Sequence, residues 1–333
     1  MSTRHTPWSR RRFSAAALAL AGTAAHAQPA PPAAAAPRIR LMIPFSAGAT
    51  SDVLARPIMH ALEAELGRPI VIENKPGVGG MLGAAEVARA APDGLTLAWG
   101  TVSNHAISPS LFPNPLYDPL RDFTPISLIC SVPHVIMVHP RVPANTLPEL
   151  VALLRREPGR WDYASSGNGT SSHLIAEAFK AATRTFVVHI PYRPSQGLPD
   201  FLAGRVALKF DTVVMSRAPA LDGRARALAV TSARRSAVLP QVPTVQESGV
   251  PELAQFEASG WFGLYGPPGM AAELVERLNA AVLAALRRPE VVAHLRSNGA
   301  ELIGSTPQAF AEHNRREVER WSALIRRLGV RAD

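Results

Sequence analysis

The stretch "RIRLMIPFSAGATSDVLARPIMHALEAELG", residues 38–67, changes its hydrophobic pattern in the middle. It begins with a short apolar run, as in a buried strand, and ends with apolar side chains at three- and four-residue spacing, as in a helix. Gly67 stands just past the last periodic residue, where helices commonly end. A strand, a loop and a helix in this order begin a βαβ unit, so the stretch predicts a parallel sheet.

The same order recurs along most of the chain. Helical periodicity separates short apolar runs and returns in two amphipathic segments near the C-terminal end, 271–288 and 306–329. The further strands that we expect lie at 69–74, 95–100, 161–166, 186–192, 205–211 and 226–231.

Two extended apolar segments without helical periodicity interrupt this order. They are residues 123–140, which Pro133 breaks into two runs, and residues 260–269. We interpret both as crossings between two α/β blocks, so the first block is discontinuous. The expected lobes are residues 38–132 with 256–333, and residues 133–255, with a cleft between them.

The first 27 residues have the layout of a secretory signal peptide: a basic start, an apolar middle and the ending Ala25-His26-Ala27. Arg10 and Arg11 resemble a twin-arginine export signal, but the general secretory route stays open. An uncleaved membrane anchor is the alternative, although the apolar run is shorter than the ~20 residues that a spanning helix needs. Residues 28–37 predict a flexible lead-in, and we expect a periplasmic protein.

Composition narrows the class of partner. The net charge is +9, but basic residues are spread along the chain and aromatic residues make up only 6%, which argues against nucleic-acid binding. Cys130 is the only cysteine, so no intrachain disulfide forms. The scattered histidines predict no metal site, and we expect no cofactor.

Three loops follow predicted strands and precede predicted helices: residues 44–52, 99–105 and 165–173. Each combines small residues with hydroxyl side chains at a helix start, where free N–H groups and the helix dipole attract an anion. The alternative for residues such as Thr50, Ser51 and Ser171 is simple helix capping. The third loop, "SSGNGTSSH", lacks the third glycine of a dinucleotide fingerprint and the lysine of a P-loop.

A secreted serine hydrolase is the competing interpretation of the third loop. No Gly-x-Ser-x-Gly elbow occurs there, but the sequence leaves open a triad. Its members would come from Ser165, Ser166 or Ser171 with His173, His189 and Asp211.

Several strings together resemble a known family. They include "IPFSAGATSDVLARP", "VIENKPGVGG", "PDGLTLAWG", "YASSGNGTSSHLIAEAF" and "PTVQESG", in this order between about residues 38 and 330. They resemble the substrate-binding proteins of tripartite tricarboxylate transporters, the TctC or Bug receptors. The resemblance implies a two-lobed periplasmic-binding-protein fold of type II, the Venus flytrap, in which each lobe is a mainly parallel sheet flanked by helices. It also implies that amides and hydroxyls hold a small carboxylate, without a catalytic role.

The resemblance assigns ligand-binding roles to residues in all three loops and after two later strands. They are Phe45, Ser46, Ala47, Gly48, Asp52, Thr101, Ser103, Asn104, Ser165, Ser166, Gly167, Gly169, Thr170, His173, Tyr192 and Asp211. Tyr192 could instead be an edge-packing aromatic. Asp211 could hold the hinge or contact the ammonium group of an amino-acid ligand.

Two departures from the family pattern bear on the ligand. Ala49 stands where the family has the second glycine of a pair, and a positive φ there would strain the loop by about 1 kcal/mol. Pro194 follows Tyr192-Arg193 where the family has glycine, which removes an N–H donor.

The resemblance, together with the hydroxyl-rich loops, implies a monomeric periplasmic receptor for a di- or tricarboxylate, an aromatic acid or an amino acid. The resemblance also implies that it delivers this ligand to a membrane permease of the tripartite class. Signalling to a sensor kinase is the alternative among binding functions.

Overall fold

The computed structural model describes residue 2 and residues 37–193 and 196–331. The expected signal peptide and lead-in lie outside the described residues, except for residue 2 and Pro37. Pro194 lies outside them as well.

The opening stretch folds as its pattern predicts. Strand β1 (Ile39–Ile43) leads into helix α1 (Thr50–Leu66), which ends at Gly67 with a φ of 61°. β1 pairs in parallel with β2 (Ile70–Asn74) and with β3 (Thr96–Thr101). The connections contain η1 (Val78–Gly80), α2 (Met81–Val87), the π-helical turn η2 (Ser103–Ile107) and α3 (Ser108–Leu111).

Helix α1 contains a proline in its body. Pro57 has no N–H, so it cannot donate to the carbonyl of Val53 one turn earlier. The imidazole Nε2 of His294, in α9 (Pro289–Ser297), lies 3.0 Å from that carbonyl oxygen and donates to it. A side chain from the far end of the chain therefore satisfies the group that the proline leaves free.

Strand β4 (Thr124–Val138) is continuous, so the expected break at Pro133 is wrong. Up to Pro133 it pairs antiparallel with β9 (Ser259–Gly266), and from His134 onward it pairs with β7 and β8. Pro133 sits where the strand changes partners, and there its missing N–H is tolerated. Both expected crossings are thus strands that join one sheet path.

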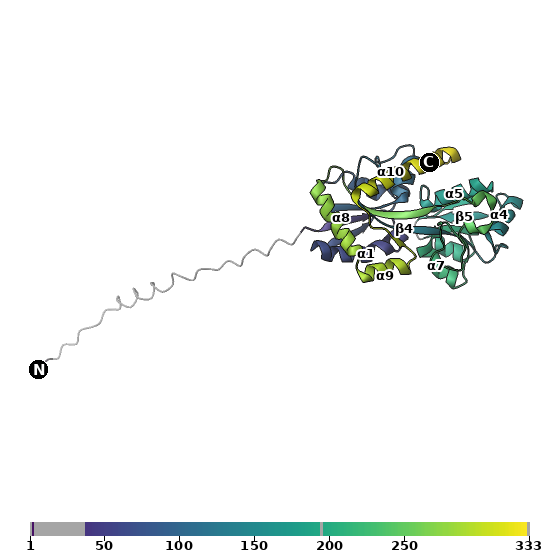
Figure 1. Ribbon diagram of the computed structural model, residues 1–333, viewed down its shortest axis with the longest axis horizontal. Helices are drawn as coiled ribbons and strands as arrows, with labels where there is room; N and C mark the ends of the chain where they lie inside the picture. Colours follow the sequence, from purple (N-terminus) through teal and green to yellow (C-terminus); the bar gives the residue numbers. More distant parts are fainter. Residues whose placement is uncertain (1, 3–36, 194–195, 332–333) are drawn as a thin grey trace. The chain divides into compact units, whose positions relative to one another are not determined.

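Beyond β4 lies a second set of strands and helices (Figure 1). β5 (Asp162–Ser165) pairs in parallel with β6 (Val188–Pro191) and with β7 (Leu208–Thr212). The other elements of this set are α4 (Leu147–Arg156), α5 (Ser171–Thr183), α6 (Gly197–Leu202), α7 (Val213–Leu221), β8 (Arg226–Val230), η3 (Gln246–Ser248) and η4 (Pro251–Leu253). We call this set the β5 side, and the part built on β1, β2, β3 and β9 the β1 side.

The chain returns to the β1 side after β9. Helices α8 (Ala272–Leu286) and α9 pack against α1, and β10 (Glu301–Leu302) pairs with β4. The long helix α10 (Pro307–Leu328) packs on η2 and β4. No helix within the described part of the chain is long and apolar enough to cross a membrane.

The sheet is covered on both faces. Alternate side chains of β1 enter two different cores: Met42 belongs to one, and Leu41 and Ile43 belong to the other. Both cores continue through β4 into the β5 side, and Cys130 is buried in the second. This layered arrangement places the loops after β1, β3, β5 and β7 around one space.

Candidate functional site

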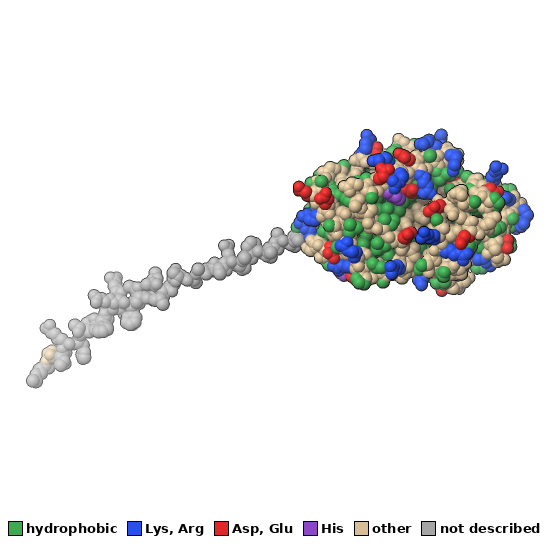
Figure 2. Space-filling view, viewed as in Figure 1, with side chains coloured by type: hydrophobic (Ala, Val, Ile, Leu, Met, Phe, Trp, Pro, Cys, Tyr) green, Lys and Arg blue, Asp and Glu red, His purple; other side chains and the backbone are tan. Residues whose placement is uncertain are grey.

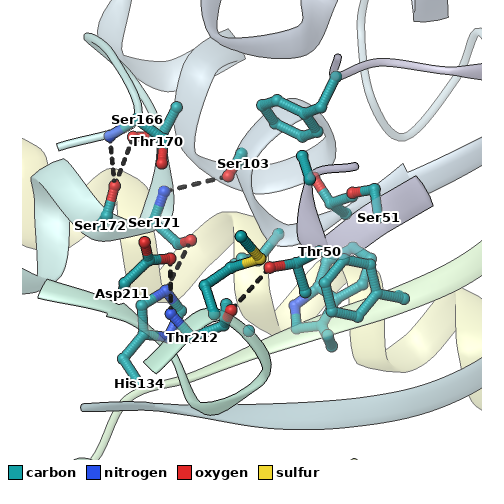
Figure 3. A pocket seen from close by; sticks show the side chains of 18 of the residues that line it. Thr50, Ser51, Ser103, His134, Ser166, Thr170, Ser171, Ser172, Asp211 and Thr212 are labelled. Carbon is teal, nitrogen blue, oxygen red and sulfur yellow. Dashed lines mark hydrogen bonds between the residues drawn. The ribbon is translucent and has the colours of Figure 1, made fainter. Parts of the chain in front are cut away.

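A cavity of about 70 Å³ lies between the β1 side and the β5 side (Figure 3). One water needs about 10–15 Å³ on the same measure, so the space holds several heavy atoms. Its walls are Phe45, Ala49, Thr50, Ser51, Thr101, Val102, Ser103, His134, Ser166, Thr170, Ser171, Ser172, Leu198, Asp211, Thr212, Met215, Gly260, Trp261 and Phe262. Nine of these residues carry hydroxyl groups.

The two sides contact each other directly at this cavity. The hydroxyl oxygens of Thr50 and Thr212 lie 2.6 Å apart, and the backbone N–H of Ser171 donates to the hydroxyl of Ser103 at 3.0 Å. In Figure 3 these contacts come from opposite walls. The structure therefore has its two sides closed on one another.

The start of α1 forms the wall on the β1 side. Thr50 and Ser51 occupy the first turn, whose N–H groups have no acceptor within the helix. Ala49 precedes them with a φ of −73°, whereas Gly48 has a φ of 78°. The alanine is therefore unstrained, and the strain that its departure from the family pattern could have caused does not arise.

Asp52 holds this loop from behind the cavity. Its carboxylate accepts hydrogen bonds from the N–H of Gly48, from Arg56 and from Asn74, at 2.8–3.0 Å. Burial alone would raise the pKa of Asp52, but the hydrogen bonds outweigh burial and hold the pKa below its usual value. Asp52 is not among the wall residues, and neither are Ser46, Ala47 and Gly48.

The second loop brings Thr101 and Ser103 to the cavity. Asn104 lies beneath them, fully buried, and its side-chain oxygen accepts from both the N–H and the hydroxyl of Thr101 at 2.8 Å. It fixes the π-helical turn that follows β3, a kind of turn often found at functional sites.

The third loop supplies Ser166, Thr170, Ser171 and Ser172 at the start of α5. Gly167 and Gly169 have φ values of 109° and 76°, which side chains rarely adopt, and both lie outside the wall. Glycine is therefore needed here for its backbone conformation and, at Gly169, also because a side chain would collide with Ser108.

Two histidines support the third loop from below. The N–H of Gly169 donates to Nδ1 of His173 at 3.3 Å, and the N–H of Gly167 donates to the hydroxyl of Ser165 at 3.1 Å. That hydroxyl in turn forms a hydrogen bond of 2.6 Å with Nε2 of His189. The two imidazoles stack at 4.2 Å, and burial lowers their pKa values to about 4 for His173 and about 3 for His189.

Asp211 is the one acidic residue in the described wall, and no Arg or Lys of the described chain lines it. Its carboxylate lies 3.0 Å from the buried Nζ of Lys209 and accepts from the N–H of Thr212 at 2.8 Å. Tyr192 points elsewhere: its hydroxyl donates to Asp200 at 2.9 Å, and its ring packs over Gly197.

Three helices begin at the cavity: α1, α5 and α7, the last with Thr212 as its N-cap. Each start contributes a partial positive charge and unpaired N–H donors. The ion pair with Lys209 offsets the charge of Asp211. The cavity is therefore suited to an anion, although no cationic side chain of the described residues forms its wall.

The sequence prediction missed the far wall. His134 on β4 lies 3.0 Å from the hydroxyl of Ser171, and Trp261 and Phe262 on β9 close the cavity from the other side. Leu198 and Met215 add apolar surface. His134, Trp261 and Phe262 lie on the two segments that the sequence predicts as crossings between the lobes. A strand that joins two lobes must pass the cleft between them, so its residues could have been named as candidates.

The triad expected of a serine hydrolase is not assembled at the cavity. Ser165 pairs with His189 at 2.6 Å, but Ser165 is fully buried and lies outside the cavity wall. His173 binds the N–H of Gly169 and stacks on His189, while Ser171 lies 3.0 Å from His134. Nδ1 of His134 has no partner among the described residues, so no carboxylate orients the ring as in a catalytic triad. Burial lowers the pKa of His134 to about 4, which keeps the ring neutral at pH 7.

Comparisons with known proteins show the family. Residues 54–330 match the family described as "Tripartite tricarboxylate transporter family receptor". The periplasmic binding protein BugD is 31% identical, with a TM-score of 0.83 over 89% of this chain and 99% of BugD.

Two further solved structures carry ligands. Rpa4515 of Rhodopseudomonas palustris, solved with adipate, is 34% identical, with a TM-score of 0.83 over 88% of this chain and 98% of that one. MatC of the same organism, solved with malate, is 30% identical, with a TM-score of 0.81 over 86% and 98%. The chain therefore belongs to the TctC (Bug) family of tripartite tricarboxylate transporter receptors, which are periplasmic binding proteins of mixed α/β fold and not enzymes.

Proposed function

We propose that this protein captures a small dicarboxylate in the cavity between its two sides. The observation that carries the proposal is that α1 and α5 start on opposite sides of one cavity lined with hydroxyl groups. One carboxylate would accept from the first turn of α1, with Thr50 and Ser51. The other would accept from the first turn of α5, with Ser171 and Ser172.

Relatives support this ligand class. Rpa4515 was solved with adipate and MatC with malate, and both molecules are dicarboxylates. The site residues proposed here are those of the cavity wall other than Asp211, while Asp52, Asn104, Ser165 and His173 act by holding the loops. Asp211 takes a structural role, since Lys209 and the N–H of Thr212 already occupy its carboxylate.

Ligand entry requires the two sides to separate. We assign residues 38–132 with 256–333 to one lobe and residues 133–255 to the other, which places the change of partners in β4 and the start of β9 at the hinge. Contacts such as Thr50 with Thr212 would break on opening and form again around the ligand.

The wider role follows from the family. We propose that the protein is exported to the periplasm by its N-terminal signal and acts there as a monomer. It would pass its ligand to a membrane permease of the tripartite class, with signalling to a sensor kinase as the alternative use of the same closed state.

The test is a thermal-unfolding screen with malate, adipate and longer and shorter dicarboxylates, each beside its diamide. A true ligand at a hundredfold excess over Kd should stabilise the fold by about 2.7 kcal/mol. The diamide should have no effect, because helix starts favour the anion.

A matched pair of variants locates the site. Ser171→Asp places a fixed carboxylate at the start of α5 and should abolish the ligand effect, whereas Ser297→Asp, exposed on α9, should leave it unchanged. If no dicarboxylate shifts the transition, or if both variants respond alike, the proposed function is wrong.

A further inference from the structure

A second, larger hollow lies behind the ligand cavity. It measures about 1090 Å³ and is lined by Arg234 from the β5 side and by Arg287 and Arg296 from the β1 side. Gly260 and Trp261 of β9 line both this hollow and the ligand cavity. We call it the β9 groove; only the wall at Gly260 and Trp261 is common to the two spaces.

The β9 groove carries more positive than negative charge. Five arginines and three glutamates line it. Arg235 pairs with Glu247 and Arg320 pairs with Glu317, but Arg234, Arg287 and Arg296 have no carboxylate partner among the described residues. In Figure 2, blue side chains with a histidine and a few red ones gather over the region of α10.

Apolar side chains lie beside these arginines. Leu302 and Ile303 line the groove and are 39% and 40% exposed, so they offer apolar surface to a ligand. The groove is as large as pockets that enclose organic ligands of drug size. Its chemistry therefore suits an organic anion better than a bare inorganic ion.

A chain of hydrogen bonds links the groove to the ligand cavity. The indole N–H of Trp261 donates to one carboxylate oxygen of Glu317 at 3.0 Å, and Arg320 donates to the other oxygen at 3.1 Å. Glu317 is only 8% exposed, while Arg320 lines the groove. An anion near Arg320 would compete with Glu317 for this guanidinium, and Glu317 sets the position of the Trp261 ring.

We propose that the β9 groove binds a small organic anion with at least two negative charges, held between Arg234 and the pair Arg287 and Arg296, and that Trp261 senses it. Planar guanidinium groups form paired hydrogen bonds with oxyanions, which makes arginine suited to this role. Because the arginines come from both sides of β9, the anion bridges the two lobes. The site is separate from the proposed dicarboxylate site and does not depend on it.

The probe is naphthalene-1,5-disulfonate, a rigid dianion without carboxylates, titrated calorimetrically into the full chain at about 20 mM ionic strength, where screening is weak. Sulfate at equal ionic strength is the small-ion control. We expect binding of the disulfonate, and Arg287→Gln with Arg296→Gln should weaken it by about tenfold or more. Arg326→Gln with Arg327→Gln, at the exposed end of α10, removes the same charge outside the groove and should leave the affinity unchanged.

The response of Trp261 is measured by NMR. Its indole N–H signal, assigned with Trp261→Phe, should shift on addition of the disulfonate and should stay in place in the Arg287→Gln, Arg296→Gln double variant. Ser171→Asp, which blocks the proposed dicarboxylate site, should leave disulfonate binding intact, so the two proposals can fail separately.

Four results would overturn the inference: no binding, equal weakening in both arginine pairs, loss of binding in Ser171→Asp, or a Trp261 signal that does not move at saturation. The first three mean that the groove is not a specific anion site. The fourth means that Glu317 and Trp261 do not sense it.

Discussion

The starts of α1 and α5 face the same cavity but are held in place by different chemistry. Behind α1, an ionised carboxylate, Asp52, gathers Gly48, Arg56 and Asn74. Behind α5, neutral imidazoles do the equivalent work: His173 accepts from the N–H of Gly169, and His189 is hydrogen-bonded to the hydroxyl of Ser165. Both solutions keep the supporting side chains outside the cavity wall, and this leaves the helix starts free to attract an anion.

The difference makes the two loops sensitive to different conditions. An ionised carboxylate keeps its hydrogen bonds down to acidic pH, while an imidazole that accepts a hydrogen bond loses this ability when it is protonated. The β5 side should therefore respond to acid first.

The largest expected effect is this acid response. Burial lowers the pKa of His173 from 6.5 to about 4, so the unfolded chain takes up a proton before the folded protein does. The stability from the neutral ring is complete above pH 6.5 and is lost as the pH falls, by about 3 kcal/mol at pH 4. Hydrogen exchange, corrected for intrinsic rates, should show Gly169 losing protection between pH 6.5 and 4 while Gly48 keeps it.

A variant separates His173 from the other buried histidines. His173→Asn keeps a side-chain acceptor for the N–H of Gly169 but cannot titrate, so protection of Gly169 should no longer depend on pH in this range. Parallel loss of protection at Gly48 and Gly169 would contradict the distinction between the two loops.

The next effect concerns the carboxylate behind α1. Asp52→Ala leaves the N–H of Gly48 and the amide of Asn74 without their acceptor and should lower the free energy of unfolding by about 2 kcal/mol. Urea unfolding measures this change in the free energy of unfolding. Asp222→Ala is the control, because Asp222 is exposed and its carboxylate pairs with the exposed Arg224. Its effect should stay within about 0.5 kcal/mol; a similar loss in both variants would assign no special role to Asp52.

The smallest effect tests the proline that α1 has and α5 lacks. His294→Ala removes the donor to the carbonyl of Val53 and should cost about 1 kcal/mol of stability. In a Pro57→Ala background the backbone N–H of residue 57 can donate a hydrogen bond to the carbonyl of Val53. The same His294→Ala change should then lower the stability clearly less. His60→Ala, exposed on the same helix, is the control. An equal cost of His294→Ala in both backgrounds would disprove the compensation.

Much of the fold was predictable from periodicity. The strand, loop and helix of residues 38–67, the start of α5 and the return of the last helices follow from patterns of apolar spacing and from caps such as Gly67. Helices α7 and α9 were missed, because both are short and α7 contains Pro219, which weakens the helical signal. The continuity of β4 through Pro133 was missed because proline disfavours the interior of a strand, and the change of partners that tolerates it at Pro133 is not visible in the sequence.

The candidate site was predictable in part. Phe45, Thr101, Ser103, Ser166, Thr170 and Asp211 line the cavity, whereas Asp52, Asn104, Ser165 and His173 turn their polar groups toward the backbone of their own loops. A motif names the loop that approaches a ligand. It does not tell which side chains face the ligand and which hold the loop.

The sequence by itself determined most of the order of strands and helices, the three loops rich in hydroxyl groups at residues 44–52, 99–105 and 165–173, and the resemblance to the family, because these are local patterns read within a few residues. Only the tertiary structure decided that His134, Thr212, Trp261 and Phe262 complete the cavity, that His294 satisfies the carbonyl freed by Pro57, and that Glu317 joins the cavity to the β9 groove. The reason is distance along the chain. Glu317 and Trp261 are 56 positions apart in the sequence, and His294 and Val53 are 241 positions apart. Such pairs meet only when the whole sheet has formed.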